Sequence, residues 1–127
     1  MVVLDSWALL AILKREAAAE RVRGAWTAEG AAMSSINLGE ALYVETRRVG
    51  APRSAEVIRA ARAQMTVVDP DWDLVSVAAG LKARGGLSYA DAFCVATAQR
   101  LDLPVMTGDP EIVALAGEVE IVDLRSA

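Results

Sequence analysis

Short runs of hydrophobic, often β-branched residues alternate along the chain with longer stretches in which hydrophobic residues recur at helical spacing. The short runs predict strands at 1–4, 31–35, 65–69, 104–107 and 119–123. The longer stretches predict helices at 6–16, 17–28, 37–49, 52–64, 71–84, 88–101 and 110–116. This alternation predicts an α/β domain with a mainly parallel sheet covered by helices on both faces. The chain has no repeat and no interdomain linker, so we expect a single domain over 1–127.

Composition favours a soluble protein with a hydrophobic core. The 127 residues are 54% hydrophobic and 24% charged, and a single cysteine excludes an intrachain disulfide. The apolar N-terminal run contains Asp5 and its basic residues follow it, whereas a secretory signal has the opposite order. No apolar run approaches the roughly 18 residues of a membrane span. We expect a cytoplasmic location and no membrane partner.

Charge and histidine content narrow the chemistry. The net charge is −4, and the chain lacks the excess of basic residues found in a typical nucleic-acid binder. The absence of histidine excludes imidazole acid–base catalysis, Ser-His-Asp and Cys-His arrangements, and zinc sites that need imidazole. Any hydrolytic chemistry must therefore use carboxylates, with or without a metal ion.

Acidic residues recur at one kind of position in the predicted fold. Asp5 ends the first strand, Glu40 follows the second, and Asp109 follows the fourth. Asp91 lies near the start of LSYADAFCVATA, a helix that is apolar nearly all round and leads into the fourth strand. The carboxyl ends of parallel strands open at one edge of the sheet, where ligands bind. We expect the acids to meet there, Asp91 included if its helix begins at that edge.

Each acid also stands where a helix cap would. The matching patterns are Asp5 before the helix at 6–16, Asn37-x-x-Glu40, Ser88-x-x-Asp91, and Asp109 before Pro110. Capping explains acids at helix starts but does not explain convergence. Converging carboxylates repel one another unless a cation is present, and oxygen ligands suit Mg²⁺ or Mn²⁺. Such a cation can bind a phosphodiester and activate water, so these acids favour a metal site.

Several segments together resemble a known family. They are LDSWALLAIL, SSINLGEALY, LSYADAFCVATAQRLDLPVMTGDPEI and the closing EIVDL. In this order and spacing, the chain from Met1 to about Leu124 resembles the PIN-domain ribonucleases. More narrowly, it is similar to the VapC-type toxins of toxin–antitoxin modules. The resemblance implies a three-layer α/β/α fold with a central sheet of four to five strands. It also implies Mg²⁺- or Mn²⁺-dependent endoribonuclease activity on an RNA substrate.

The resemblance also implies roles for particular residues and partners. Asp5 and Asp91 would be the principal metal ligands, and Glu40 and Asp109 would complete this catalytic acidic quartet. Asn37 and Thr107 match the polar residues that support such a site. Members of the family commonly form homodimers. They are inhibited by a cognate antitoxin, whose C-terminal segment often places a basic side chain in the acidic pocket.

Two other functions remain open from the sequence. A phosphoacceptor receiver domain has a similar length and element order, and Asp69 and Thr107 would match its acceptor and hydroxyl positions. Receivers usually carry paired acids after the first strand and a lysine after the last, where this chain has Asp5-Ser6 and Asp123-Leu124-Arg125. The other alternative is a PIN-fold binding module without catalysis, which the intact acids argue against.

Other reactive or aromatic residues receive structural interpretations. Cys94 lies in an apolar helix with no histidine to activate it, so we expect a core residue. The tryptophans sit in apolar helical patterns and are expected to pack in the core or a dimer interface: Trp7, Trp26 and Trp72. Arg47 and Arg48 could meet RNA phosphates at the rim of the site or simply end a solvated helix.

Overall fold

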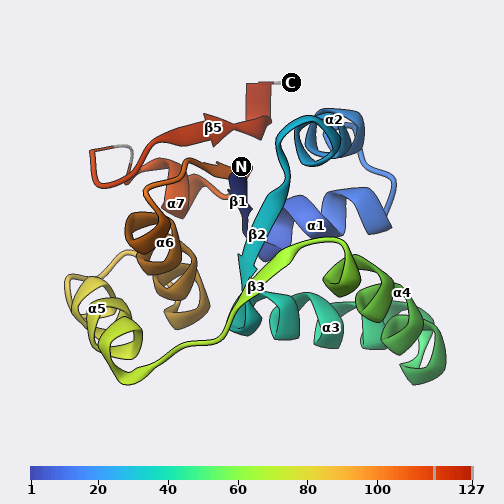
Figure 1. Ribbon diagram of the computed structural model, residues 1–127, viewed down its shortest axis with the longest axis horizontal. Coiled ribbons are helices and arrows are strands. Elements are labelled where there is room, and N and C mark those ends of the chain that lie inside the picture. Colours follow the sequence, from blue (N-terminus) through green and yellow to red (C-terminus); the bar gives the residue numbers. More distant parts are fainter. Residues whose placement is uncertain (116, 127) are drawn as a thin grey trace.

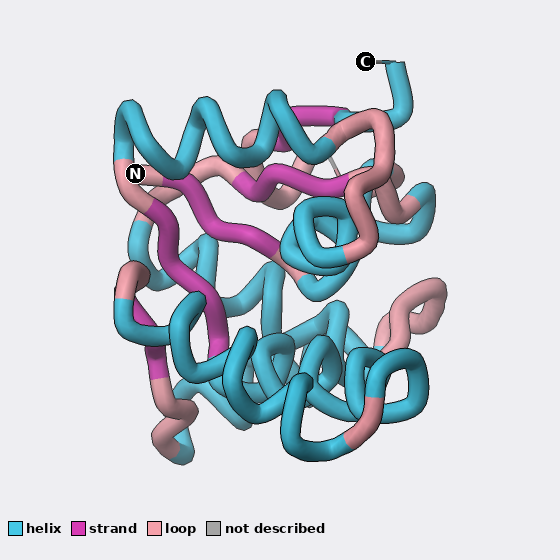
Figure 2. Tube along the Cα trace, turned by 90° about the vertical axis from the view of Figure 1, so that its right-hand side faces the viewer, coloured by secondary structure: helices cyan, strands magenta, loops and turns pink. Residues whose placement is uncertain are grey.

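The computed structural model describes residues 1–115 and 117–126 and contains a sheet of parallel strands. The strands are β1 (Val2–Leu4), β2 (Ala31–Ser34), β3 (Thr66–Val68), β4 (Val105–Thr107) and β5 (Ile121–Asp123). Their order is β3-β2-β1-β4-β5, and every neighbouring pair is parallel. The strands lie side by side among the helices in Figure 2. The predicted α/β class with a parallel sheet is confirmed.

Helices form between the strands where the sequence predicts them. They are α1 (Ser6–Leu13), α2 (Ala19–Glu29), α3 (Ser35–Val49), α4 (Ala51–Ala63), α5 (Trp72–Ala83), α6 (Tyr89–Leu101) and α7 (Pro110–Val113), followed by the short 3₁₀ helix η1 (Leu124–Ser126). The helix predicted at 6–16 ends early, at Leu13, because the chain turns at Arg15, whose φ is 55°. Ala116, the last residue of the helix predicted at 110–116, lies outside the described residues.

Alternate residues of the short strands build two separate cores. Val2, Leu4 and Met33 face α1, α2, α3 and α4 on one side of the sheet. Val3 and Ala32 face α5, α6 and α7 on the other side. This alternation follows from the two-residue side-chain period of a strand. The result is the expected three-layer α/β/α arrangement, with the two helical layers on either side of the sheet in Figure 1.

Helix α6 is buried on all sides over most of its length. Every residue from Asp91 to Ala98 is buried, because α6 packs against both α5 and the sheet. This burial explains the nearly uniform apolar sequence of the helix. Its C-cap, Asp102, takes the left-handed conformation (φ 53°) and turns the chain into β4. Because the helix returns to the start of β4, its N-terminus lies near the carboxyl edge of the sheet.

The strand order contains one topological switch point. The chain builds β1, β2 and β3 outward in one direction and then crosses to place β4 and β5 on the other side of β1. The switch point therefore lies between β1 and β4, which is where open α/β sheets bind ligands. A receiver domain instead has its third strand beside its first. Here β2 separates them, so Asp69 after β3 is not adjacent to Asp5, and this topology does not fit the receiver alternative.

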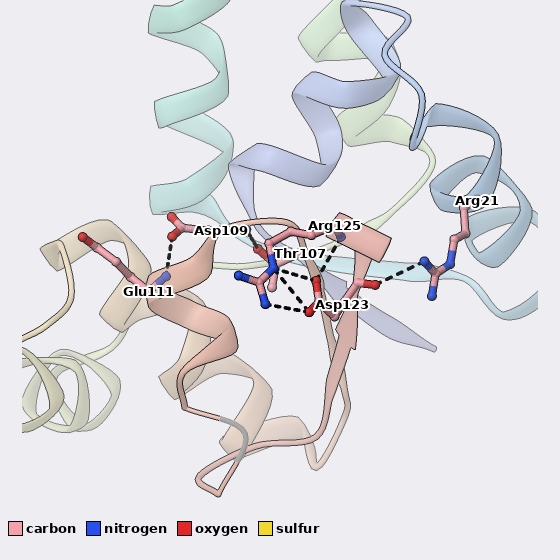
Figure 3. Close-up of polar contacts among 6 residues, drawn as sticks. All are labelled: Arg21, Thr107, Asp109, Glu111, Asp123 and Arg125. Atoms are coloured by element: carbon pink, nitrogen blue, oxygen red, sulfur yellow. Dashed lines mark hydrogen bonds and ion pairs between the residues drawn. The ribbon is translucent and has the colours of Figure 1, made fainter. Parts of the chain in front are cut away.

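The end of β5 is held by polar contacts. The Arg125 guanidinium pairs with the Asp123 carboxylate, with Nη2 and Oδ2 2.9 Å apart. Arg21 on α2 donates to the Asp123 carbonyl oxygen at 3.2 Å (Figure 3). The Arg125 pairing lowers the pKa of Asp123. These contacts give Asp123 a structural role at the C-terminal edge of the sheet.

Two local expectations from the sequence were wrong, and a third was wrong in part. Ser35, predicted to end a strand, belongs to α3, because the Ser34 hydroxyl accepts the Ile36 backbone N–H at 3.2 Å and caps the helix one position earlier. Asn37 therefore lies inside the first turn and is not a cap. Trp72 is 77% exposed at the start of α5, so it does not pack in the core of the chain, and its packing in a dimer interface stays a prediction. No helix in the described ranges is long and apolar enough to cross a membrane.

Candidate active site

Thr107 joins the ends of β1 and β4 through two acids. Its hydroxyl donates a short hydrogen bond to Asp5 Oδ2 and accepts the Asp109 backbone N–H at 2.9 Å. The other Asp5 oxygen, Oδ1, accepts the Ala8 backbone N–H at 2.8 Å and caps α1. Asp109 caps α7 through the Glu111 backbone N–H, also at 2.8 Å (Figure 3). Capping and convergence therefore occur together at these two acids.

The N-terminus of α6 carries Asp91 to the same edge of the sheet. The Ser88 hydroxyl caps the helix by accepting the Asp91 backbone N–H at 3.1 Å, so the predicted capping role of Ser88 is confirmed. From α3, Asn37 Nδ2 donates to the Ala90 carbonyl oxygen at 2.8 Å. Asn37 is fully buried, and this bond ties the first turn of α3 to the first turn of α6. Asn37, which was predicted to cap α3, therefore instead positions α6, the helix that bears Asp91.

Glu40 reaches the edge from α3. Its Oε1 accepts the Ser6 hydroxyl at 2.6 Å, which connects α3 to the start of α1 just after Asp5. Ser6 was not singled out by the sequence, although it follows Asp5 directly at a strand-to-helix junction. The contact orients one oxygen of Glu40.

These elements enclose a pocket of about 420 Å³ at the carboxyl ends of β1 and β4. One part of its wall is acidic, formed by Glu40, Asp91, Asp109 and Glu111. The apolar part is formed by Trp7, Leu10, Val44 and Pro110. Asp5 is 1% exposed and lies behind the wall, not on it. A second cavity, about 480 Å³, is lined by Ile12, Arg23, Trp26, Thr27 and Gln64; without carboxylates it offers no comparable chemistry.

Burial and mutual repulsion perturb two of the acids. Burial raises the pKa of Asp5 to about 7, and the charges of Asp109 and Glu40 add to this rise, while the Thr107 hydrogen bond opposes it. Burial likewise raises the pKa of Asp91 to about 7, with repulsion from Asp109 as the next cause. Strongly perturbed carboxyls in a cleft are typical of functional sites. Without a counter-charge, the protein holds these groups partly protonated near neutral pH.

The chain matches a known protein family over most of its length. The sequence model of the PIN domain matches residues 2–118. The chain belongs to the PIN domain family. This assignment agrees with the fold resemblance already visible in the sequence segments. No curated protein matches this chain in sequence.

Solved structures similar to this PIN domain include several toxin–antitoxin proteins. A toxin–antitoxin complex from Klebsiella pneumoniae has a TM-score of 0.78 and 20% identity, covering 98% of each chain. The sarcin–ricin loop cleaving toxin VapC20 of Mycobacterium tuberculosis has a TM-score of 0.77 and 21% identity, covering 91% of this chain and 95% of its own. DNA-bound VapBC from Salmonella typhimurium has a TM-score of 0.78 and 21% identity, and the match covers 98% of this chain and 99% of that one. At these identities the likeness establishes the fold.

The acidic wall of this PIN domain fits a divalent cation. Carboxylate oxygens of Asp91, Asp109 and Glu111 lie within 4.8 Å of one another. Among the described residues, Asn37 Oδ1 is the buried side-chain polar atom that lacks a hydrogen-bond partner. A set of donors made only of oxygen atoms suits hydrated Mg²⁺ or Mn²⁺. Glu111 was missed by sequence reasoning, although an acid two residues after Asp109 on the same helix start was the available signal.

The other residues considered in the sequence analysis, Arg47, Arg48 and Cys94, lie outside the pocket. The Arg47 guanidinium lies over the Tyr43 ring, 5.2 Å from its centroid. Arg48 Nε donates to the buried Glu45 carboxylate at 2.7 Å, and neither arginine lines the pocket. Cys94 is buried in α6, and burial with the nearby acids raises its pKa well above the usual value, so it is the expected inert core thiol.

Proposed function

We propose that this PIN domain, taken as a single domain over residues 1–127, is an endoribonuclease that depends on Mg²⁺ or Mn²⁺. It hydrolyses RNA phosphodiester bonds as the toxin of a toxin–antitoxin module. The observation that carries the proposal is the convergence of Asp5, Glu40, Asp91 and Asp109 at the switch point between β1 and β4. The sarcin–ricin loop cleaving activity named for the similar VapC20 structure supports RNA as the substrate.

Some of the acidic residues would bind the cation, and another would orient the attacking water. A divalent cation bound at the site would neutralise the acids and act as a Lewis acid on the phosphodiester. Asp91 and Asp109 face the pocket and would hold that cation, with Asp5 close behind them. Thr107 fixes the Asp5 carboxylate, and Asn37 fixes the helix that carries Asp91.

Glu40 is the acid best placed to orient the attacking water. The Ser6 hydroxyl donates a hydrogen bond to its Oε1, and Glu40 lines the pocket. A carboxylate oriented in this way can accept a proton from water as a general base. Histidine is not required for this chemistry, in agreement with the composition of the chain.

We further propose a cognate antitoxin as the inhibitory partner and a homodimer as the functional assembly in the cytoplasm. The acidic wall, without a lysine or arginine among the residues that line the pocket, suits a basic antitoxin side chain. Similar solved structures described as toxin–antitoxin complexes support this partner. Exposed apolar side chains on α3 support a subunit interface; they are Ile36, Leu42 and Tyr43. Light scattering of the purified chain measures the mass of the assembly.

The test uses the full chain purified free of any antitoxin. It is incubated with structured RNAs in Mg²⁺ or Mn²⁺, and then with EDTA, alongside Asp91→Asn and Glu40→Gln. The control is Glu120→Gln, which removes the same charge from an exposed position outside the pocket. We expect cleavage by the wild type and the control, with loss in EDTA and in both site variants.

Three outcomes would contradict this function. Cleavage that persists in EDTA would remove the metal requirement. Full cleavage by both Asp91→Asn and Glu40→Gln would remove the site assignment. A chain that binds RNA or an antitoxin but cleaves nothing in either cation would favour the non-catalytic PIN-fold binding module.

A further inference from the structure

We propose that Arg47 on α3 binds a backbone phosphate of the RNA strand beside the acidic pocket, with its guanidinium held in place by the Tyr43 ring. The proposal rests on the proposed function, because it assigns a contact with the RNA substrate of the same site. The structure thereby separates Arg47 from Arg48, which the sequence treats alike.

The pocket itself offers no basic side chain to RNA. Its lining contains acids but no lysine or arginine. A cation held by those acids serves the phosphodiester that reacts. The neighbouring phosphates of the strand are also charged, and proteins bind such phosphates mainly with lysine and arginine. Because the net charge of the chain is −4, these contacts must come from particular side chains near the pocket and not from a broad basic surface.

Arg47 lies on the face of α3 that borders the pocket. Glu40 and Val44, on the same helix, line the pocket. Residues three or four positions apart are neighbours on a helix surface, so Tyr43 adjoins Glu40, and Arg47 adjoins both Val44 and Tyr43. At 1.5 Å per residue, Arg47 stands about 10 Å beyond Glu40 along the helix axis. Its long side chain can therefore reach a phosphate near the one that reacts.

The Arg47 guanidinium is oriented but unpaired with any acid. Its Cζ lies 5.2 Å from the centroid of the Tyr43 ring, and the side chain is exposed. Among the described residues, no carboxylate forms an ion pair with Arg47. Stacking on the ring restricts the side chain, while the N–H donors at the edge of the planar guanidinium stay open to a phosphate. Less conformational entropy is then lost when the phosphate binds.

Arg48 is instead committed to the fold. Its Nε and Nη2 donate to the two carboxylate oxygens of Glu45 at 2.7 and 3.0 Å. Nη2 also donates to the Leu13 carbonyl oxygen at 3.2 Å, which ties α3 to the end of α1. Glu45 is 1% exposed, so a turn of Arg48 toward RNA would leave a buried carboxylate without its partner. Of the two adjacent arginines, only Arg47 can bind a phosphate without this cost.

RNA binding by the full chain tests the role of Arg47. Glu40→Gln serves as the parent, because under the proposed function it keeps the cation but does not cleave. The fluorescence anisotropy of a labelled single-stranded RNA is measured in Mg²⁺ over a range of KCl concentrations. The parent is compared with the same chain carrying Arg47→Gln, Arg47→Lys or Arg59→Gln. Arg59 is exposed on α4 and has no ion pair in the described part of the chain, so Arg59→Gln is the matched control.

We expect Arg47→Gln to weaken RNA binding by about tenfold at low salt, because a charge-assisted contact is lost. Its Kd should also depend less on KCl, and the loss should be equal for RNAs of different base sequence, because phosphates are common to all of them. Arg47→Lys should recover part of the affinity, since it keeps the charge without the planar fork. Arg59→Gln should bind RNA as the parent does.

Two substitutions of Tyr43 test the support given by the ring. Tyr43→Phe keeps the ring and should bind RNA as the parent does. Tyr43→Leu removes the ring and should weaken binding by about two- to fivefold. Tyr43 also belongs to the side chains proposed for the subunit interface, so light scattering is measured for each variant. The mass of the assembly and the Tm should stay those of the parent.

The outcomes separate this contact from the proposed function. Parent-like RNA affinity in Arg47→Gln, or an equal loss in Arg59→Gln, overturns the contact. A lower assembly mass in Arg47→Gln or Tyr43→Leu would place the pair in the subunit interface and also overturn it. A wild type that cleaves RNA with a KM unchanged by Arg47→Gln keeps the nuclease function and removes the contact. Weaker RNA binding in Arg47→Gln together with a wild type that cleaves no RNA supports the contact and removes the nuclease function.

Discussion

The Trp7 indole packs directly against Gly108, in the turn between β4 and Asp109. A Cβ added at Gly108 would lie 2.5 Å from Cη2 of Trp7 and 2.6 Å from Cε2. Trp7 also lines the apolar part of the pocket and packs on the core that contains α1. The close approach of a rigid ring requires glycine at position 108 and fixes the turn that carries Asp109.

Gly108→Ala should therefore destabilise the protein by about 1–3 kcal/mol, the usual cost of overpacking a well-filled site. Thermal and denaturant unfolding measure the change. Trp7→Leu combined with Gly108→Ala should recover part of the loss, because the smaller side chain yields space to the new methyl group. Gly80→Ala is the matched control, since an added Cβ there meets nothing within 4 Å and alanine favours the helix. An unchanged Tm in Gly108→Ala would contradict the contact.

The raised pKa values of Asp5 and Asp91 predict how stability depends on pH. Both carboxyls titrate at about 7 in the folded protein and near 3.8 when unfolded. Between these values the folded state binds more protons than the unfolded state, so stability falls as pH rises. Below pH 3.8 both states are protonated, and above pH 7 both are ionised, so the contribution levels off. The metal-free protein should thus lose stability from about pH 4 to pH 7.

Unfolding of metal-free wild type, Asp5→Asn and Asp91→Asn across this range measures the slope. In each variant the stability should fall less steeply with pH than in the wild type. Above pH 7 each variant should be more stable than the wild type, because the substitution removes a buried charge. Mn²⁺ should restore stability to the wild type above pH 7 because it neutralises the ionised acids. Parallel curves for the wild type and both variants would contradict the assigned pKa shifts.

Thr107 couples the ionisation of Asp5 to the position of Asp109. Thr107→Val keeps the shape but removes the donor to Asp5 and the acceptor of the Asp109 N–H. Leaving buried polar groups unpaired should cost about 1–3 kcal/mol of stability. The Thr107 hydrogen bond lowers the pKa of Asp5, so its loss should raise that pKa further. The acidic limb of the RNA-cleavage pH profile should then move to higher pH.

Thr107→Ser keeps both hydrogen-bonding roles and is the conservative control. It should retain the wild-type pH profile with at most the small packing loss of one methyl group. Identical pH profiles for Thr107→Val and the wild type would show that Thr107 does not act on Asp5.

Local sequence signals predicted the elements but not every contact between them. The runs around Val3 and Val105 revealed strands because both faces of the sheet are covered, and Asp5 and Asp109 marked helix starts because they cap them. The convergence of acids followed from parallel strands alone. The order of the strands was not predictable, because strand pairing joins distant segments and leaves no local pattern in the sequence. That order decides whether Asp69 lies next to Asp5.

The cap of α3 and the contact made by Asn37 show the same limit. Ser34, Ser35 and Asn37 are all residue types that cap helices, so local preference could not choose among them. The structure chooses Ser34, and Asn37 instead reaches Ala90, 53 residues away in the chain. The place of Glu111 beside Asp91 could not be predicted for the same reason, because the distance between the two residues is set by the packing of α6 and α7 on the sheet.

Asn37 should position Asp91 through the backbone of α6. Asn37→Asp is nearly isosteric but replaces the Nδ2 donor with an oxygen that faces the Ala90 carbonyl. Loss of this buried bond should cost about 1–3 kcal/mol, and the displaced helix start should weaken Mn²⁺ binding at the acidic wall of the pocket. Urea unfolding and Mn²⁺ titration measure the two effects.

Ser88→Ala provides the comparison for Asn37→Asp, because it removes the cap of the same helix and should cost about 1 kcal/mol. If Asn37 positions Asp91, Asn37→Asp should reduce Mn²⁺ affinity more than Ser88→Ala does, even when a second stabilising change such as Gly80→Ala restores its Tm. A restored Tm accompanied by wild-type Mn²⁺ affinity would show that the Asn37–Ala90 contact supports the fold alone and does not position Asp91.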